Sequence, residues 1–132
     1  MKPTLADLCA ALLAVFEGPM KLEAYRDSGG VLTIGRGHTH GVTAGMTITH
    51  DQAVAFLAED QAPLLKLVAD KPPLAGAAYA SFGFNCGAGA LHAVLTGIDT
   101  LANPKHCTDK HGVVLPGLVS RRALEQLLIA AA

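Results

Sequence analysis

The chain has 132 residues, of which 51 % are hydrophobic and 16 % are charged, and its net charge at neutral pH is −1. This length favours a single domain, and the apolar content excludes a disordered chain. The near-zero net charge argues against a strongly basic nucleic-acid-binding protein, so no nucleic-acid partner is expected.

The N-terminal third predicts a helix followed by a β-hairpin. Thr4 and Asp7 have the spacing of a capping box, and Gly18-Pro19 ends the helix. Four apolar residues recur at helical spacing: Leu5, Leu8, Leu12 and Phe16. The alternating pattern of Lys21 to Ile34, interrupted by a turn at Ser28-Gly29-Gly30, predicts the hairpin. We expect a third short strand or a loop from Gly35 to Gly45.

A second helix is predicted to begin near Thr49, which forms another capping-box pattern with Gln52. Pro63 should kink or split this helix, because proline removes a backbone hydrogen bond. Its apolar side is formed by Phe56, Leu57, Leu64 and Val68.

The segment from Pro72 to Ile98 contains no Asp, Glu, Lys or Arg and is long enough to span a bilayer. Its repeated glycines favour two buried helices joined at Asn85-Cys86-Gly87 instead, so no stable membrane insertion is expected. A last helix is predicted from Arg121 to Ile129, with Leu124, Leu127 and Leu128 facing inward. Together the elements predict an α+β fold with segregated helices and strands.

The densest polar region extends from Glu17 to His40. Glu17 ends an apolar helix, where partial desolvation and the helix C-terminus favour the protonated form that a general acid needs. Asp27 follows the first strand, where solvent and backbone donors keep a carboxylate ionised. Two carboxyls in unlike environments meet the requirement of glycoside hydrolysis, and Thr33 could hold a water. The same pattern also fits a solvated helix end and a turn former.

The amino-acid sequence of this region closely resembles that of phage-type lysozymes, glycoside hydrolase family 24. The resemblance rests on Glu17-Gly18, on Leu22 to Asp27, on Gly30 and on Thr33 to Thr39. It continues through Gly41-Val42, Gly45-Met46, Ile48-Thr49, Gln52-Ala53, Phe82 to Ala90 and Val114 to Arg122.

The resemblance implies a lysozyme-like α+β fold with a cleft between two lobes. The small hairpin lobe would span about residues 17–48, and the larger helical lobe residues 1–16 and 49–132 of one domain. It implies Glu17 as the acid, with Asp27 and Thr33 holding the attacking water. It further implies substrate contacts from Phe84 and Asn85. Structural support is expected from a His38–Asp60 pair and from Arg121 and Arg122, one of which reaches toward the catalytic Glu.

The function implied is that of an endolysin muramidase that cleaves the β-1,4 bond between N-acetylmuramic acid and N-acetylglucosamine in peptidoglycan, with inversion. We expect a monomer without metal or cofactor, held in the host cytoplasm until a holin lesion releases it to the wall. Two alternatives remain: a lytic transglycosylase, and a wall-binding remnant with little or no activity. The remnant is suggested by an extra residue near Pro19-Met20-Lys21 and by a short segment from His92 to Gly112.

Other combinations of reactive side chains are weaker candidates. His106, Cys107 and His111 could ligate zinc, but no fourth ligand is evident. Cys86 with His92 could suggest a cysteine hydrolase, although Cys86 also fits a small packed residue beside a glycine turn. The three cysteines are too scattered to form a disulfide framework.

Overall fold

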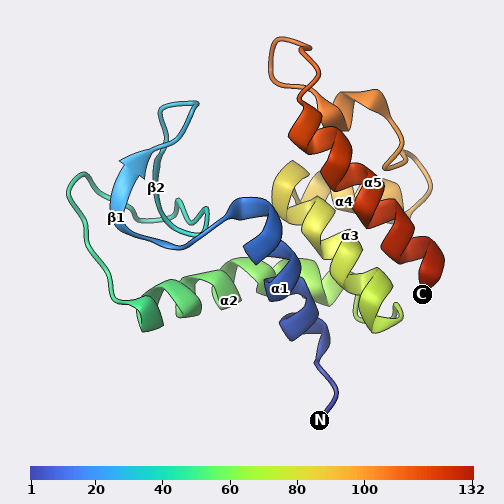
Figure 1. Cartoon of the computed structure of the whole chain (residues 1–132), viewed down its shortest axis with the longest axis horizontal. Coiled ribbons are helices and arrows are strands. Elements are labelled where there is room, and N and C mark those ends of the chain that lie inside the picture. Colours follow the sequence, from blue (N-terminus) through green and yellow to red (C-terminus); the bar gives the residue numbers. More distant parts are fainter.

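The computed structural model describes all residues from 1 to 132 and has five α-helices beside one antiparallel pair of strands. In Figure 1 the hairpin stands to one side of the helices, which confirms the predicted α+β class. The elements are α1 (Leu5–Glu17), β1 (Lys21–Arg26), β2 (Leu32–Gly35), α2 (His50–Leu67), α3 (Pro73–Cys86), α4 (Ala88–Leu95), the 3-10 helix η1 (Pro104–Cys107) and α5 (Pro116–Ala131).

The first helix begins and ends where the sequence predicts. The Thr4 hydroxyl accepts a hydrogen bond from the Asp7 N–H, and the Asp7 carboxylate accepts one from the Thr4 N–H. Gly18 follows the helix with a φ of +76°, a conformation that glycine adopts without steric cost. The chain therefore leaves α1 directly after Glu17 and turns into β1.

The hairpin is irregular at its base and regular at its tip. Tyr25 pairs with Thr33 and Arg26 with Leu32, whereas Lys21 pairs with Gly35, so the register shifts inside β1. The irregularity thus lies within the strand and not only in the preceding loop, where the sequence suggested the extra residue. On its other edge β1 pairs with the segment around Thr47, which forms an isolated bridge with Glu23.

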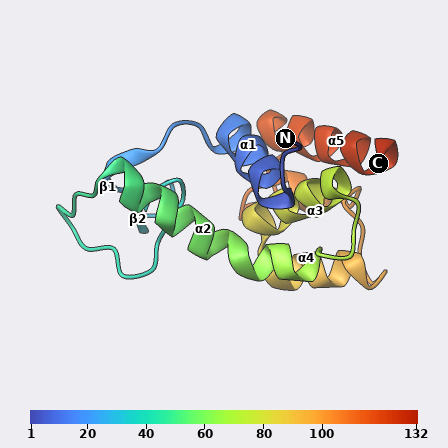
Figure 2. The same ribbon diagram turned by 90° about the horizontal axis from the view of Figure 1, so that it is seen from below.

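Helix α2 extends from beneath the hairpin to the other helices (Figure 2). Thr49 and Gln52 form the predicted capping box at its start. The helix is continuous through Pro63, so the predicted split does not occur. Because α2 contacts both strands and also α1, α3 and α4, it is the element that joins the hairpin to the helical core.

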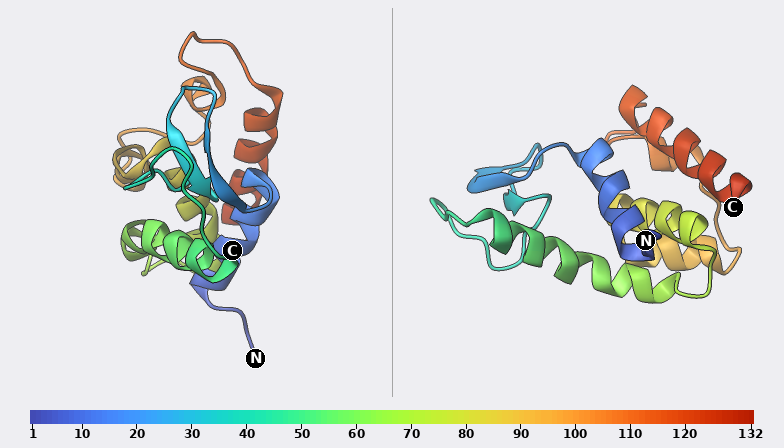
Figure 3. Two further views of the ribbon diagram at one scale, coloured as in Figure 1. Left: turned by 90° about the vertical axis from the view of Figure 1, so that its left-hand side faces the viewer. Right: turned by 60° about the horizontal axis from the view of Figure 1, so that its bottom comes forward.

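Helix α3 lies at the centre of the helical part and packs against α1, α2, α4 and α5 (Figure 3). Eight of its residues are buried, and most of them are alanine, glycine or serine. These small side chains allow the neighbouring helices to approach closely. The predicted break at Gly87 separates α3 from α4, and no helix of the structure is long and apolar enough to cross a membrane.

The inward face of α5 is charged, contrary to the prediction. Arg121, Arg122 and Glu125 are its buried residues, whereas Leu127 is 66 % exposed. The helix also begins earlier than predicted, at Pro116. Leu124 and Leu128 are half-buried, so the prediction is wrong only for Leu127. The sequence pattern did not show that the charges of this helix are buried in pairs with one another and with α3.

Substitution of Gly83 by Ala tests the close packing around α3. A Cβ at Gly83 would lie 2.8 Å from methyl carbons of both Leu64 and Leu91, so we expect a loss of about 1–3 kcal/mol in unfolding free energy. Gly89→Ala is the control, since no atom lies within 4 Å of the position that its methyl group would occupy. Alanine should leave stability unchanged there or raise it by up to about 1 kcal/mol. Equal melting temperatures for the two variants would contradict this account of the packing.

Candidate active site

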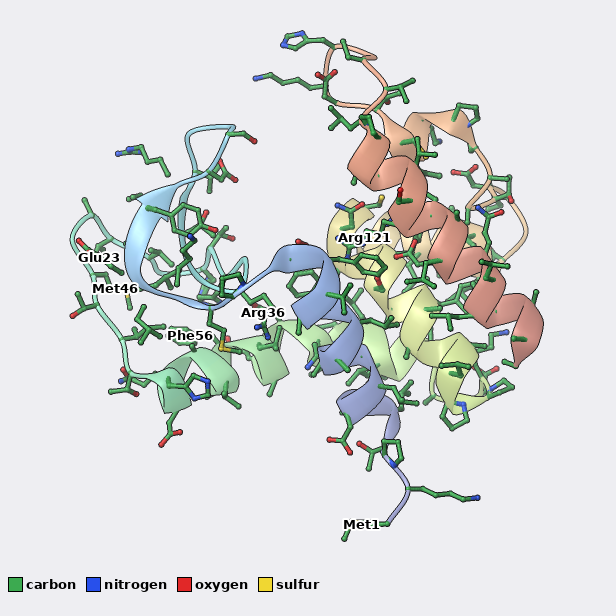
Figure 4. The ribbon with its side chains drawn as sticks, in the orientation of Figure 1. Met1, Glu23, Arg36, Met46, Phe56 and Arg121 are labelled. Atoms are coloured by element: carbon green, nitrogen blue, oxygen red, sulfur yellow. The ribbon has the colours of Figure 1, made fainter.

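Glu17 lies at the end of α1, where its side chain is 27 % exposed and meets a buried arginine. Arg121 Nη1 donates to Glu17 Oε1 over 3.2 Å, and the Arg121 side chain is only 4 % exposed. The guanidinium also lies over the Phe16 ring, 4.7 Å from its centroid. The contact between the last helix and Glu17 that the family resemblance implies is therefore present. Arg121 is labelled in Figure 4.

Three further contacts hold Arg121 in place. Its Nη2 donates to the carbonyl and the hydroxyl oxygens of Ser81 on α3, over 2.9 and 3.3 Å. Its Nε donates to Glu125 Oε2 over 3.4 Å. Because the guanidinium is fixed by both α3 and α5, it offers Glu17 a donor of defined position.

Asp27 and Thr33 lie on the hairpin. The Oδ1 atom of Asp27 accepts hydrogen bonds from the N–H groups of Gly29 and Val31, both over 2.9 Å. Thr33 Oγ1 donates to the Val31 carbonyl over 2.9 Å, and Thr33 is 3 % exposed. Both side chains are thus tied to the same turn, and no hydrogen bond or ion pair joins either of them to Glu17.

Two hollows flank the hairpin. One, of about 640 Å³, lies between Ser28-Gly29 of the hairpin turn and the segment containing Lys110, His111 and Leu115. The other, of about 290 Å³, is lined by Gly37 and His40 on one side and by Asp60, Leu64 and Phe84 on the other. Phe84 therefore borders a hollow, whereas Asn85 is exposed at the end of α3, and Glu17, Asp27 and Thr33 line neither hollow.

His38 and Asp60 form the contact that the resemblance implies. His38 Nδ1 lies 2.8 Å from Asp60 Oδ2, and the His38 ring stacks on Phe56 of α2 at a centroid distance of 4.1 Å. His38 is 3 % exposed, so its polar ring is buried with a partner. A second tie is supplied by Arg36, whose Nε donates to the Gly18 carbonyl over 2.9 Å. These contacts anchor the hairpin to α2 and to the end of α1.

The weaker candidates occupy other roles in the structure. His106 Nε2 lies 2.9 Å from Asp99 Oδ2, and no cluster of three potential ligands that could hold a metal is present. Burial raises the pKa of the Cys86 thiol, although Arg122 partly opposes the effect. A raised thiol pKa disfavours the thiolate that a cysteine hydrolase requires.

Sequence reasoning missed three residues of this site. Ser81 and Glu125 contact Arg121, and Arg36 joins the hairpin to Gly18. The only available signal was the spacing of Arg121 and Glu125, since residues four apart share one face of a helix.

Comparison with known proteins identifies the family. A family model described as phage lysozyme matches residues 14–125. The chain belongs to the phage lysozyme family. This lysozyme is a glycoside hydrolase, as the sequence predicted. An endolysin of Acyrthosiphon pisum secondary endosymbiont phage 1 is 33 % identical to it over 143 residues, covering 92 % of this chain and 94 % of that protein.

Solved structures confirm the lysozyme-like fold. The active form of the phage P1 endolysin Lyz superposes with a TM-score of 0.77 at 25 % identity, covering 94 % of this lysozyme and 83 % of that chain. The muramidase domain of SpmX from Asticaccaulis excentricus gives a TM-score of 0.74 at 26 % identity, covering 97 % and 98 % of the two chains.

Replacement of Asp99 in this lysozyme should have a pH-dependent effect on stability. Hydrogen bonds from the Asn103 amide and the Thr100 N–H hold the pKa of Asp99 well below its usual range. A carboxyl with a lowered folded-state pKa stabilises the fold above its unfolded pKa of about 4, and this contribution is lost as the pH falls. Asp99→Asn should therefore lower the melting temperature at pH 7, with a difference from wild type that narrows between about pH 4 and pH 2.

The exposed Asp70 provides the matched control, because Asp70→Asn makes the same chemical change away from these hydrogen bonds. Its melting temperature should follow that of the wild type throughout. An Asp99→Asn deficit of equal size at pH 7 and pH 2.5 would instead indicate a loss of packing.

Proposed function

We propose that this chain hydrolyses the β-1,4 bond between N-acetylmuramic acid and N-acetylglucosamine in bacterial peptidoglycan. The observation that carries the proposal is Glu17, a half-buried carboxyl at a helix end, held by the buried Arg121 over 3.2 Å. Its position within the segment that matches phage lysozymes supports the same conclusion, as does a fold shared with a muramidase domain.

Glu17 is assigned the role of general acid. It would give its proton to the glycosidic oxygen of the leaving sugar, which makes that oxygen a better leaving group. The carboxyl becomes a carboxylate in that step, and the Arg121 guanidinium beside it would stabilise the new charge. The same contact would keep the carboxyl in one orientation before the proton is transferred.

Asp27 is assigned the role of general base, with Thr33 as its helper. Two backbone N–H groups hold Oδ1 of Asp27, which leaves Oδ2 for a water. Because the Thr33 hydroxyl donates its proton to Val31, its oxygen is free to accept one from that water. Inversion requires the two carboxyls to be about 6.5–9.5 Å apart. The absence of a direct contact between Glu17 and Asp27 is compatible with this arrangement.

The glycan would bind between the hairpin and the helices. Phe84 offers an aromatic surface beside one hollow, and the exposed Asn85 follows it at the end of α3. No metal or cofactor takes part in this mechanism. In an infected cell such a lysozyme would act as a monomer once a holin lesion gave it access to the wall.

Glu17→Gln should abolish lysis without unfolding the protein. The amide is nearly isosteric but has no acidic proton, so we expect a rate loss of about 10²–10⁴-fold or more. The measurement is turbidity loss of permeabilised Gram-negative cells, with circular dichroism to verify the fold. Wild-type lysis by this variant would reject Glu17 as the acid. A wild-type protein that binds peptidoglycan without cleaving it would be a wall-binding remnant.

Asp27→Asn should also remove hydrolysis, and the products of the wild-type enzyme should report the mechanism. Water addition gives a reducing sugar, whereas a lytic transglycosylase gives an anhydro sugar that is lighter by one water. Mass spectrometry of the fragments separates the two, and NMR of fresh products shows whether the anomeric configuration is inverted. Full activity of Asp27→Asn, or anhydro products, would exclude the assigned role of Asp27.

A further inference from the structure

Glu125 is a fully buried carboxylate that the mechanism above does not use. It is 0 % exposed and lies on α5, one turn after two buried arginines. Burial of an ionised group at such a site destabilises the folded state unless the group is paired and hydrogen-bonded. The position therefore calls for a physical explanation.

The contacts of Glu125 form a charge cluster, which we define as Glu17, Arg121, Arg122 and Glu125. Oε2 of Glu125 accepts from the Ser81 hydroxyl over 2.6 Å, from Arg122 Nη2 over 3.1 Å and from Arg121 Nε over 3.4 Å. Oε1 lies 2.7 Å from Arg122 Nε. Glu125 thus holds both guanidiniums, and the opposite side of Arg121 contacts Glu17.

The charges of the cluster balance when both glutamates are ionised. Two guanidiniums then face two carboxylates, all within a largely buried region. When Glu17 carries the proton that it must donate, the cluster has one positive charge in excess. Without Glu125 the cluster would have two positive charges in excess. A more positive environment favours loss of the proton from Glu17.

We propose that Glu125 is a positioning residue for the acid, which aims the Arg121 guanidinium at Glu17 and balances the charge of Arg122 so that Glu17 faces only one uncompensated guanidinium. This inference rests on the proposed role of Glu17. Glu125 does not contact substrate, so its effect passes through Arg121.

The other ionisable groups around the cluster do not replace this charge. From α1, Cys9 is buried and its pKa is raised to about 11, so it is neutral. From α3, Cys86 accepts from Arg122 Nη1 over 2.9 Å, and burial raises its thiol pKa as well. From η1, His106 packs against Phe82, over which Arg122 lies. On the hairpin side Arg36 contacts Gly18, and Asp27 is held by its own turn.

Burial raises the pKa of Glu125 itself, and the Ser81 hydroxyl and both arginines oppose that effect. The hydroxyl and the guanidiniums are donors that stabilise a buried carboxylate. Their loss would disturb the cluster even without a change at Glu125.

The decisive experiment compares pH profiles of hydrolysis of purified peptidoglycan. Glu125→Gln keeps the shape of the side chain but removes its charge. We expect the alkaline limb of the profile to be displaced by about one pH unit toward acid, which would lower activity at pH 8 by up to about tenfold. Glu59→Gln makes the same change on the exposed face of α2 and should leave the profile unchanged.

Arg122→Met tests the sign of the effect, because it removes a positive charge and should displace the alkaline limb toward higher pH. The double variant Arg122→Met/Glu125→Met removes one charge of each sign and should restore the wild-type limb. Arg122→Met alone provides the test if Glu125→Gln does not fold, because a purely structural role of the charge cluster would leave its limb unmoved. Lower melting temperatures with an unmoved limb in both single variants would overturn the proposal and leave Glu125 a structural role.

These experiments also distinguish a failure of the role inferred for Glu125 from a failure of the role proposed for Glu17. An active wild type with an inactive Glu17→Gln variant supports the acid whatever happens at Glu125. If Glu17→Gln retains full activity, the acid assignment fails. If only the pH profiles fail to move, Glu17 remains the acid and the role of Glu125 is rejected.

Discussion

The burial of two guanidiniums beside a single fully buried carboxylate is the constraint on which the helical part of this lysozyme depends. A charge taken out of water needs a partner, and these groups find partners within α5 and also on α1 and α3. Arg121 reaches Glu17 on α1 and Ser81 on α3 from its own place on α5. The end of α1 is thus fixed against the two helices behind it by directional contacts, in addition to the apolar core around Leu13 and Phe82.

The hairpin is attached in a different way. It contributes little to the apolar core, and most of β1 is exposed. Its position depends on the buried His38, which stacks on Phe56 and meets Asp60, and on the hydrogen bond from Arg36 to Gly18. Figure 4 shows Arg36 and Phe56 on the side of the hairpin that faces the helices, with Glu23 on the opposite side. The separation of Glu17 from Asp27 is therefore set by a few polar contacts and by the irregular first strand.

Short sequence patterns predicted most of the helices and strands. The candidate site depends on contacts between residues that are far apart in the sequence. Thr4 and Thr49 identified the starts of α1 and α2, because a capping box is complete within four residues. Leu127 was misplaced because the apolar pattern of α5 gives no hint that its charged face is paired. The contacts of Arg121 with Glu17 and of His38 with Asp60 were expected only from the family resemblance, not from spacing. Ser81 and Glu125 are 44 positions apart, so nothing in the sequence alone brings them together.

Pro63 gives α2 an uneven stiffness along its length. Proline has no N–H to donate, so the Glu59 carbonyl lacks the helical hydrogen bond that it would otherwise accept. On one side of this gap Asp60 holds the hairpin, and on the other Leu64 is buried in the helical core. The joint between the two parts of the molecule thus lies within a continuous helix. Bending at Pro63 would change the angle between the hairpin and the helical core, and it would strain the hydrogen bond from Arg36 to Gly18 that spans the two parts.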